Sequence, residues 1–446
     1  MASKIQWFEK PLGEVTCNHD VKRKPVKESE RKRGPYPYYG ASGIVDYVDG
    51  YIFEGRHLLI AEDGENLRTR QTPIAFMADG RFWVNNHAHI VTGNGEVTTE
   101  YLHYFLQIAD IQSYLTGAVM PKLTQGNLNR IPVRYPDLEH QKSIVQVLGS
   151  LDEKISLNRR INQTLEAMAQ AVFKSWFVDF DPVKAKIAAI EQGQDPLRAA
   201  MRAMSGKVDT ELDQMPREQH DQLVATAALF PDEMEESTLG KIPKGWLASS
   251  LGAEVAYLNR GISPKYTEEK GVLVLNQKCI REFSIDPSKG RRHDALQRSV
   301  DSRFLQVGDV LVNSTGVGTL GRIGQVLSLN EPMIVDSHVT VVRAGGNLNA
   351  SFLGQWFVLR QPDIEAMGEG STGQTELSKS KLAEMGILVP GAPILSEFDR
   401  VISKLNAFVA VRNKECVFLQ KTRDLLLPKL LSGQFSLGVP PRMAGA

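Results

Sequence analysis

The chain carries one long apolar pattern twice, and the two copies stay in register at an offset of 254 residues (377 minus 123). The matched pairs are Leu123 with Leu377, Leu128 with Leu382, Ile131 with Met385, Ile144 with Phe398, Leu148 with Ile402, Leu151 with Leu405, Ile155 with Val409 and Leu165 with Leu419. A tandem duplication of a unit this large predicts two similar modules, and two modules indicate two similar ligand sites.

Each module combines a mixed globular part with a long helix. The globular parts open on Trp7-x4-Leu12-Gly13 and Trp246-x4-Leu251-Gly252. Short apolar runs follow, separated by Gly, Pro and Asn, which is typical of short strands joined by loops. A chain of 446 residues is too long for one ordinary core. The predicted class is therefore α+β, with two mixed α/β globular domains, each followed by a long α-helix.

The helices carry apolar residues in alternating steps of four and three, which predicts a heptad seam. The seam residues are Ile144, Leu148, Leu151, Ile155, Asn158 and Leu165 in the first helix and Phe398, Ile402, Leu405, Val409, Arg412 and Leu419 in the second. Asp137 is placed to cap the start of the first helix. Both helices are amphipathic and of matching length, so we expect them to pair, with the polar seam residues Asn158, Asn162 and Arg412 fixing the pairing. In the alternative, each helix merely ends a core and its asparagines face solvent.

Composition restricts the environment and the chemistry of the protein. The three cysteines are widely separated and form no C-x-x-C, so zinc and disulfide frameworks are not expected. The first ten residues lack the apolar segment of a secretion signal, and no apolar run approaches the length of a membrane span. We therefore expect a soluble, cytoplasmic protein without a membrane partner.

The formal net charge is zero, but the charges are unevenly distributed. Between Asp181 and Gly240 there are 12 acidic and 6 basic residues, so this connector carries −6 and the rest of the chain +6. A basic surplus outside the connector is compatible with nucleic-acid binding, although ordinary surface charge explains it equally well.

Sequence patterns for catalysis and metal binding are absent. There is no phosphate-binding loop, no G-x-S-x-G and no H-E-x-x-H, so we expect no catalytic residues and no metal ligands. His87 and His338 match by position in the two modules, but neither has a second ligand at metal spacing. Core or hydrogen-bonded histidines are the expectation.

Basic and amide side chains gather in loops of both modules. Basic residues interleaved with aromatic ones suit phosphate contacts, and Gln and Arg suit base edges. The candidate DNA-binding residues are Lys22, Arg23, Lys24, Arg31, Lys32, Arg33, Tyr36, Lys122 and Gln125 in the first module and Arg281, Arg291, Arg292, Arg303, Gln374, Lys379 and Lys381 in the second. The alternative is that these loops are simply solvated.

Several motifs together resemble one family, the specificity subunits of type I restriction–modification systems. The matching segments are Tyr38 to Ile44, Ala61 to Gly64, Leu151-Asp152-x-x-Ile155-x-x-Asn158, Asn162-x-x-Leu165-Glu166, Trp176 to Pro182, Leu239 to Trp246, and Leu430 to Gly433. The aromatic segment around Trp176 and the Ile-Pro-x-Gly-Trp segment that ends at Trp246 are the most specific.

The resemblance implies two target-recognition domains, each reading one half of a bipartite site on double-stranded DNA. It also implies two helices that pair as an antiparallel coiled coil with pseudo-two-fold symmetry, set the spacer and dock two methyltransferase subunits. Restriction and motor subunits complete such systems, and S-adenosylmethionine, ATP and magnesium belong to the partners. The implied limits are 1–135 and 241–390 for the recognition domains, 136–181 and 391–435 for the central and distal conserved helices, 182–240 for the connector and 436–446 for a tail.

The resemblance leaves two alternatives to this non-catalytic role. One is a helical scaffold or adaptor without sequence-specific DNA binding, and the other is an enzyme with its own methyltransferase or nuclease. The second module lacks the Tyr-Tyr-Gly-Ala-Ser-Gly segment of the first. The two recognition domains are therefore expected to read different half-sites.

Overall fold

The protein is represented by a computed structural model that describes residues 5–368, 376–435 and 437. It divides into two compact units: unit 1 comprises Met1–Leu157 and Glu415–Ala446, and unit 2 comprises Asn158–Lys414. Each unit contains one globular part together with half of each long helix. The units therefore do not end at the limits 135 and 390 expected from the sequence, which follow the globular parts alone.

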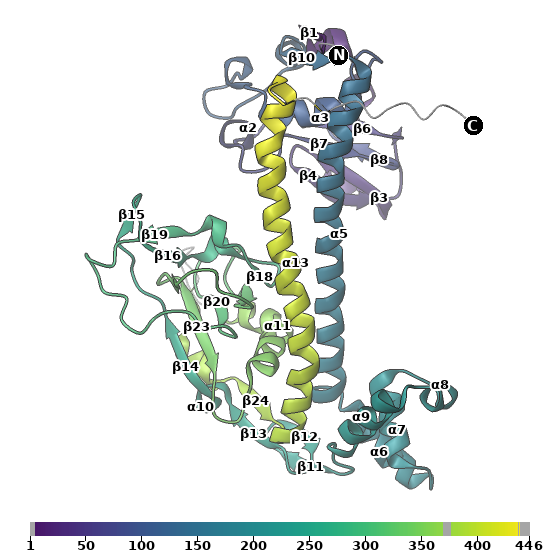
Figure 1. Ribbon diagram of the computed structural model, residues 1–446, viewed down its shortest axis with the longest axis vertical. Coiled ribbons are helices and arrows are strands. Elements are labelled where there is room, and N and C mark those ends of the chain that lie inside the picture. Colours follow the sequence, from purple (N-terminus) through teal and green to yellow (C-terminus); the bar gives the residue numbers. More distant parts are fainter. Residues whose placement is uncertain (1–4, 369–375, 436, 438–446) are drawn as a thin grey trace. The chain divides into compact units, whose positions relative to one another are not determined.

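Unit 1 contains two small sheets, as its short, Gly- and Pro-punctuated runs predict. The first sheet has the strand order β2 (Thr16–Asn18), β9 (Ala88–Gly93), β6 (His57–Ala61) and β7 (Ala75–Ala78). The second has the order β4 (Gly43–Val48), β3 (Arg33–Gly40), β8 (Arg81–Val84) and β5 (Phe53–Glu54). Helix α3 (Thr99–Ile108) packs beside β6 and β7 (Figure 1). A separate pair, β1 (Trp7–Pro11) with β10 (Pro132–Pro136), leads the chain into and out of the globular part.

Unit 2 repeats the strand order of the first sheet of unit 1 with different side chains, but its second sheet has a different strand order. Its first sheet has the order β14 (Val255–Arg260), β23 (Val339–Ala344), β20 (Val310–Asn313) and β21 (Ile323–Gln325). Its second has the order β15 (Tyr266–Thr267), β19 (Arg291–His293), β16 (Val272–Leu275) and β22 (Met333–Val335). Both second sheets contain one parallel pair, β3 with β8 and β16 with β22. Helix α11 (Ala350–Ala366) corresponds to α3, and β13 (Leu247–Ser250) with β24 (Gly386–Val389) corresponds to β1 with β10.

The two long helices are α5 (Leu138–Phe177) and α13 (Ala392–Ser432). Asp137 caps α5 as expected, because its Oδ1 accepts hydrogen bonds from the backbone N–H groups of Glu139 and His140 at 3.1 Å each. Short loops and Pro136 before the cap, and regular apolar spacing after it, make the helix start here.

In unit 1, the first half of α5 runs antiparallel to the second half of α13. Arg423 Nη1 donates to Asp152 Oδ1 at 2.8 Å, and Cys416 Sγ lies 3.8 Å from the Ile155 carbonyl oxygen. The apolar core joins Ile144 and Leu148 with residues near the end of α13, namely Leu427, Leu430 and Leu431. The core of the globular part continues into the same cluster, through residues such as Leu12, Leu58 and Tyr101.

In unit 2, the second half of α5 runs antiparallel to the first half of α13. The rings of Phe173 and Phe398 lie 5.9 Å apart, and Asn162 Nδ2 donates to Asn413 Oδ1 at 2.8 Å. Asn158 is fully buried. The expectation that the polar seam residues help to pair the helices is thus confirmed for Asn162, and the alternative in which the asparagines face solvent is wrong.

The predicted seam residues differ in how deeply they are buried. Seven of them are buried: Ile144, Leu148, Ile155, Asn158, Phe398, Ile402 and Val409. The other five, Leu151, Leu165, Leu405, Arg412 and Leu419, are half-buried at the margins of the two helix pairs. A seam that widens at its margins lets the globular parts pack beside the helices, as α11 does along the first half of α13 (Figure 1).

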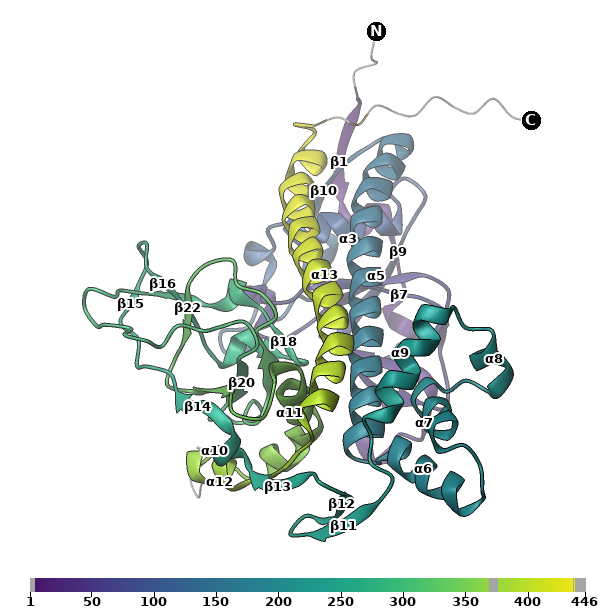
Figure 2. The ribbon, with the colours of Figure 1, turned by 60° about the horizontal axis from the view of Figure 1, so that its bottom comes forward.

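The acidic connector folds into four helices: α6 (Asp181–Glu191), α7 (Pro196–Ser205), α8 (Asp209–Asp213) and α9 (Arg217–Ala228) (Figure 2). They enclose a small core of Ala200, Met201, Leu212 and Ala227. The module is joined to the rest of unit 2 by aromatic contacts, because Trp176 packs edge-on against Phe230 at 5.2 Å. Among its acidic residues, Asp209 is held by Arg198 and Arg202.

Candidate nucleic-acid interface

The base of the candidate interface in unit 1 is an ion network at the edge of its first sheet. Asp20 lies beside His89 Nδ1 at 2.5 Å and Arg23 at 3.3 Å, and Glu62 lies beside Arg23 at 2.6 Å and Lys122 at 3.2 Å. Three basic and two acidic side chains therefore meet here. His89 Nε2 also faces the carbonyl oxygen of Leu123 at 2.7 Å, so each ring nitrogen lies against an oxygen acceptor.

The network holds its carboxylates in the ionised form. Burial by itself raises the pKa of Asp20, but the hydrogen bond and charge of His89, with the N–H of Ile90 and the charge of Arg23, lower the pKa below its ordinary value. Burial likewise raises the pKa of Glu62, but the hydrogen bonds from Arg23 and Lys122 and the charge of His89 outweigh burial and lower the pKa. The charge of Arg23 is thus paired with carboxylates inside the unit, whereas the Lys122 side chain is half exposed at the edge of the sheet.

The other candidates in unit 1 lie on the 22–36 segment and at the start of the short helix α4 (Gln125–Asn129). Lys22, Lys24, Lys32, Arg33 and Gln125 are exposed. Arg31 forms an ion pair with Asp46 at 3.2 Å and stacks over the buried Tyr38 ring at 4.6 Å, so its guanidinium stabilises the conformation of the segment. The Tyr36 ring contacts the Tyr51 ring at 5.1 Å.

A group of exposed aromatic and apolar side chains on β4 and in the segment after it was missed by the sequence reasoning. Ile44, Val45 and Tyr47 are 47%, 52% and 49% exposed, and Tyr51 is 39% exposed beside them. Arg81 stacks over the Tyr51 ring at 4.9 Å. The alternation along β4 was the available signal, but it does not reveal which face of the strand remains uncovered.

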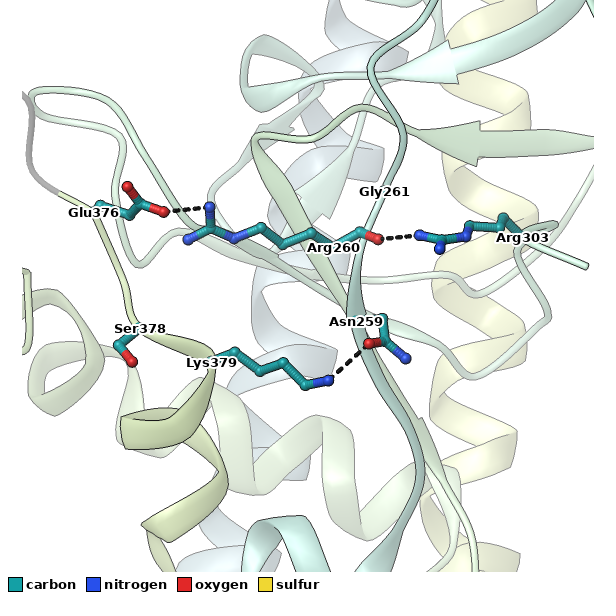
Figure 3. Close-up of a pocket in the computed structure, with 7 residues that line it drawn as sticks. All are labelled: Asn259, Arg260, Gly261, Arg303, Glu376, Ser378 and Lys379. Carbon is teal, nitrogen blue, oxygen red and sulfur yellow. Dashed lines mark hydrogen bonds and ion pairs between the residues drawn. The ribbon is translucent and has the colours of Figure 1, made fainter. Parts of the chain in front are cut away.

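In unit 2 the corresponding edge forms an open pocket of about 640 Å³ (Figure 3). It is lined by Asn259, Arg260, Gly261, Arg303, Glu376, Ser378 and Lys379. Arg260 pairs with Glu376 and donates to the Leu377 carbonyl oxygen at 2.8 Å. Arg303 Nη1 donates to the Arg260 carbonyl oxygen at 2.9 Å, and Lys379 Nζ donates to Asn259 Oδ1 at 2.7 Å. The structure thus brings the predicted Arg303 and Lys379 into one pocket.

The remaining candidates in unit 2 are spread over its loops. Arg291 stacks 3.6 Å over the Tyr266 ring, Arg292 pairs with Glu331, and Arg281 pairs with its neighbour Glu282. Lys381 is exposed on α12 (Lys379–Glu384). Gln374 lies outside the described residues.

The two edges share one scaffold but differ in chemistry. The carbonyl of Leu123 is held by His89 in unit 1, and that of the matching Leu377 is held by Arg260 in unit 2. Lys122 and Glu376, which occupy matching positions, have opposite charge. The same backbone framework therefore presents different hydrogen-bonding groups in the two units.

Neither a metal site nor a membrane span emerges from the described part of the chain. No three His, Cys, Asp or Glu side chains gather there as metal ligands would. Nor do the described helices include one that combines the length and apolar character needed to cross a bilayer.

Comparison with known proteins finds one family throughout. Residues 4–167 match the family model described as the type I restriction modification DNA specificity domain. The HindI specificity subunit of Haemophilus influenzae is 29% identical over 363 residues, covering 76% of this chain and 75% of that one. The MjaIX specificity subunit of Methanocaldococcus jannaschii is 23% identical and covers 96% of both chains. The crystal structure of a type I system S subunit from M. genitalium matches in fold, with a TM-score of 0.54, 13% identity and 96% coverage of both chains.

Proposed function

We propose that this chain, which is similar to type I restriction–modification specificity subunits, is the non-catalytic subunit that selects the DNA sequence for such a complex. Unit 1 reads one half of a bipartite site and unit 2 reads the other. The chain itself supplies hydrogen-bond donors and acceptors, and the chemistry belongs to its partners.

One observation carries the proposal: the strand order of the first sheet is built twice, with different side chains at the same edge. A duplicated framework can bind two copies of one kind of ligand, here two segments of DNA. Lys122 in unit 1 and Glu376 at the matching position in unit 2 have opposite charge, so the two edges should favour different base sequences. Base edges in the major groove present distinct patterns of donors and acceptors, so different side chains select different bases. Exposed Lys22, Lys24, Lys32 and Arg33 supply the phosphate contacts that fix position on the duplex.

We propose two roles for the long helices, which are to dock the partner subunits and to set the distance between the two half-sites. Helix α5 has 40 residues and α13 has 41, which gives each a length of about 60 Å at 1.5 Å per residue. We propose that this stiff pair sets the number of base pairs between the half-sites and docks two methyltransferase subunits. In this proposal, S-adenosylmethionine, ATP and magnesium are bound by the methyltransferase and motor subunits. The complex acts in the cytoplasm.

The test is a map of methylated adenines in cells with and without this chain. The expected result is a split motif that is methylated only when the chain is present with its methyltransferase. Purified complex should also bind a duplex carrying that motif, with an affinity that falls steeply as salt rises, because phosphate contacts release counterions. An unchanged map and salt-independent binding would favour a scaffold without a DNA role.

A further inference from the structure

Two exposed histidines occupy matching places in the two units, and three equivalent hydrogen bonds hold each of them. The backbone N–H of His87 donates to Asn85 Oδ1 at 2.8 Å, and that of His338 donates to Asp336 Oδ1 at 3.0 Å. Their carbonyl oxygens accept from the N–H groups of Glu62 at 2.9 Å and Ser314 at 2.8 Å. These bonds fix the backbone of both residues in the same way.

The third hydrogen bond fixes the ring. His87 Nδ1 lies 2.7 Å from Asp63 Oδ2, and His338 Nδ1 lies 2.8 Å from Thr315 Oγ1. Only this nitrogen of each ring takes part in a hydrogen bond among the described residues, and the His87 side chain remains 51% exposed. Each ring is therefore oriented by the protein through one nitrogen, which leaves Nε2 for a partner from outside.

Histidines with a purely structural role look different in this protein. His89 and His293, in the first sheet of unit 1 and the second sheet of unit 2, are 1% and 0% exposed. Both rings use both nitrogens: His89 reaches Asp20 and Leu123, and His293 reaches Lys265 and Arg298. These two rings are buried and fully bonded, and neither His87 nor His338 is.

Both rings also lie beside the turns that carry candidate DNA-binding residues. Asp63 forms a bridge with Lys122 in unit 1, and Thr315 forms one with Glu376 in unit 2. Lys379, three residues beyond Glu376, lines the pocket of Figure 3. A ligand that contacts Lys122 or Lys379 therefore passes close to the loop that holds the histidine.

The ring partners give the two histidines opposite hydrogen-bonding character. The Asp63 carboxylate only accepts, so His87 Nδ1 carries the proton and Nε2 of the neutral ring accepts. Thr315 Oγ1 accepts from Gln277 Nε2 at 2.7 Å, and among the described residues His338 Nδ1 is the acceptor within reach of its own hydroxyl proton. When Thr315 donates to Nδ1 in this way, His338 Nε2 carries the ring proton and donates.

We propose that His87 and His338 are matched DNA-contacting residues, one for each half-site, and that His87 accepts a hydrogen bond through Nε2 whereas His338 donates one. His87 takes a base-edge amino group, as adenine and cytosine present in the major groove. His338 takes an acceptor, either a base-edge oxygen or nitrogen or a phosphate oxygen. The inference rests on the proposed function, since it needs each unit to meet duplex DNA.

The experiment uses the complete complex with its methyltransferase. Binding and methylation are measured for wild type, His87→Ala and His338→Ala on duplexes in which each base pair of the two half-sites is changed in turn. Each variant is expected to bind the cognate duplex about 5–100-fold more weakly, as for the loss of a specific base contact. The loss of discrimination should fall in one half-site for His87 and in the other for His338.

Two further changes test the hydrogen-bonding character. Thr315→Asp supplies an acceptor to His338 Nδ1 and makes its Nε2 an acceptor, so the preferred base in that half-site should change from one that accepts to one that donates. Asp63→Thr is the matched change in unit 1. If His338→Ala weakens all duplexes equally, its acceptor is a phosphate; the same result for His87→Ala would refute the assigned acceptor role.

The controls separate a failed inference from a failed function. His220→Ala, on the connector helix α9, should leave binding and the motif unchanged. His87→Gln and His338→Gln keep a polar side chain at each position and replace the alanine variants if those lose their thermal transition. Wild-type complex without sequence-specific binding would overturn the proposed function. Specific wild-type binding that both histidine substitutions leave within about twofold would overturn the inference alone, since a base contact accounts for more.

Discussion

Asn162 and Asn413 face each other across the helix pair of unit 2, with Asn162 Nδ2 donating to Asn413 Oδ1 at 2.8 Å. The neighbouring seam positions Ile402 and Val409 are buried and apolar. A polar pair in an apolar seam lowers stability relative to leucine, but it favours the one alignment in which the two amides meet. The helices are thus held in register by a hydrogen bond as well as by packing.

Replacing Asn162 by leucine should lower the free energy of unfolding by about 1–3 kcal/mol, because Asn413 loses its partner inside the seam. The double change Asn162→Leu with Asn413→Leu should recover most of this loss, since no amide remains without a partner. Denaturant unfolding of wild type, the single variants Asn162→Leu and Asn413→Leu, and the double variant measures the coupling. Additive effects in the double variant would show that the amides do not interact.

Asp152 in unit 1 accepts hydrogen bonds from Arg423 and from the Tyr104 hydroxyl, both at 2.8 Å. Asp152→Ala should destabilise the protein by about 1–3 kcal/mol, because a half-buried guanidinium and a phenol lose their acceptor together. Asp424→Ala is the matched control, since it removes a 61% exposed partner of the same arginine and should cost less than about 1 kcal/mol. Thermal unfolding distinguishes them, and equal shifts would contradict the assignment.

Burial raises the pKa of Glu166 on α5 to about 7, beside a small cavity of about 40 Å³ that is also lined by Gln355 and Asn406. The folded state therefore holds a proton that the unfolded chain releases near its ordinary pKa of 4.5. The stabilisation is complete below pH 4.5 and is lost as the pH rises to about 7. Glu166→Gln should remove this loss and exceed wild type by about 1–3 kcal/mol above pH 7.

The measurement is the free energy of unfolding against pH for wild type and Glu166→Gln. Glu153→Gln, an exposed change on the same helix, is the control and should follow the wild-type curve. Parallel curves for Glu166→Gln and wild type between pH 5 and 8 would rule out a buried neutral carboxyl group.

Exchanging residues 1–135 for those of another specificity subunit should change one half of the methylated motif and leave the other half unaltered. The reciprocal exchange of residues 241–390 should change the other half. Because Leu427, Leu430 and Leu431 complete the core of unit 1, a foreign segment should work best with its own residues at these positions. Sequencing of methylated adenines reports the outcome, and a motif altered in both halves would contradict modular reading.

Inserting seven residues into both helices, after Leu157 and after Lys414, should change the tolerated spacer between the half-sites. One heptad adds about 10 Å, close to the length of three base pairs, and nearly preserves the seam because it completes about two turns. Binding to duplexes with spacers of graded length measures the preference. If the preferred length is the same as in wild type, the helices do not set the spacing.

The repeat and the helices were predictable because their signals are periodic. A seam with four–three steps indicates a buried face wherever it occurs, and residues such as Leu148 and Ile402 are fully buried as expected. Asp137 follows the same logic, since its capping role depends only on its neighbours along the chain. Predictions from such local or periodic features do not depend on contacts between distant segments of the chain.

The candidate interface was less predictable because it depends on contacts between distant segments. Arg23 looks like a free basic residue in its loop, yet Asp20 and Glu62 hold it. Nothing near Arg23 in the sequence points to Glu62, which follows a different strand. The exposure of Tyr47 and its neighbours on β4 was not predicted for the same reason, since tertiary packing alone decides which side chains of the strand are covered.

The core of unit 1 joins Leu12 near the beginning of the chain to Leu430 and Leu431 near its end. A ribosome releases these segments more than 400 residues apart. The first unit therefore spends nearly the whole of its synthesis with an apolar surface open to solvent and to chaperones. Its folding is completed only when the last turns of α13 emerge, so that a chain interrupted before them leaves its earliest part unfinished.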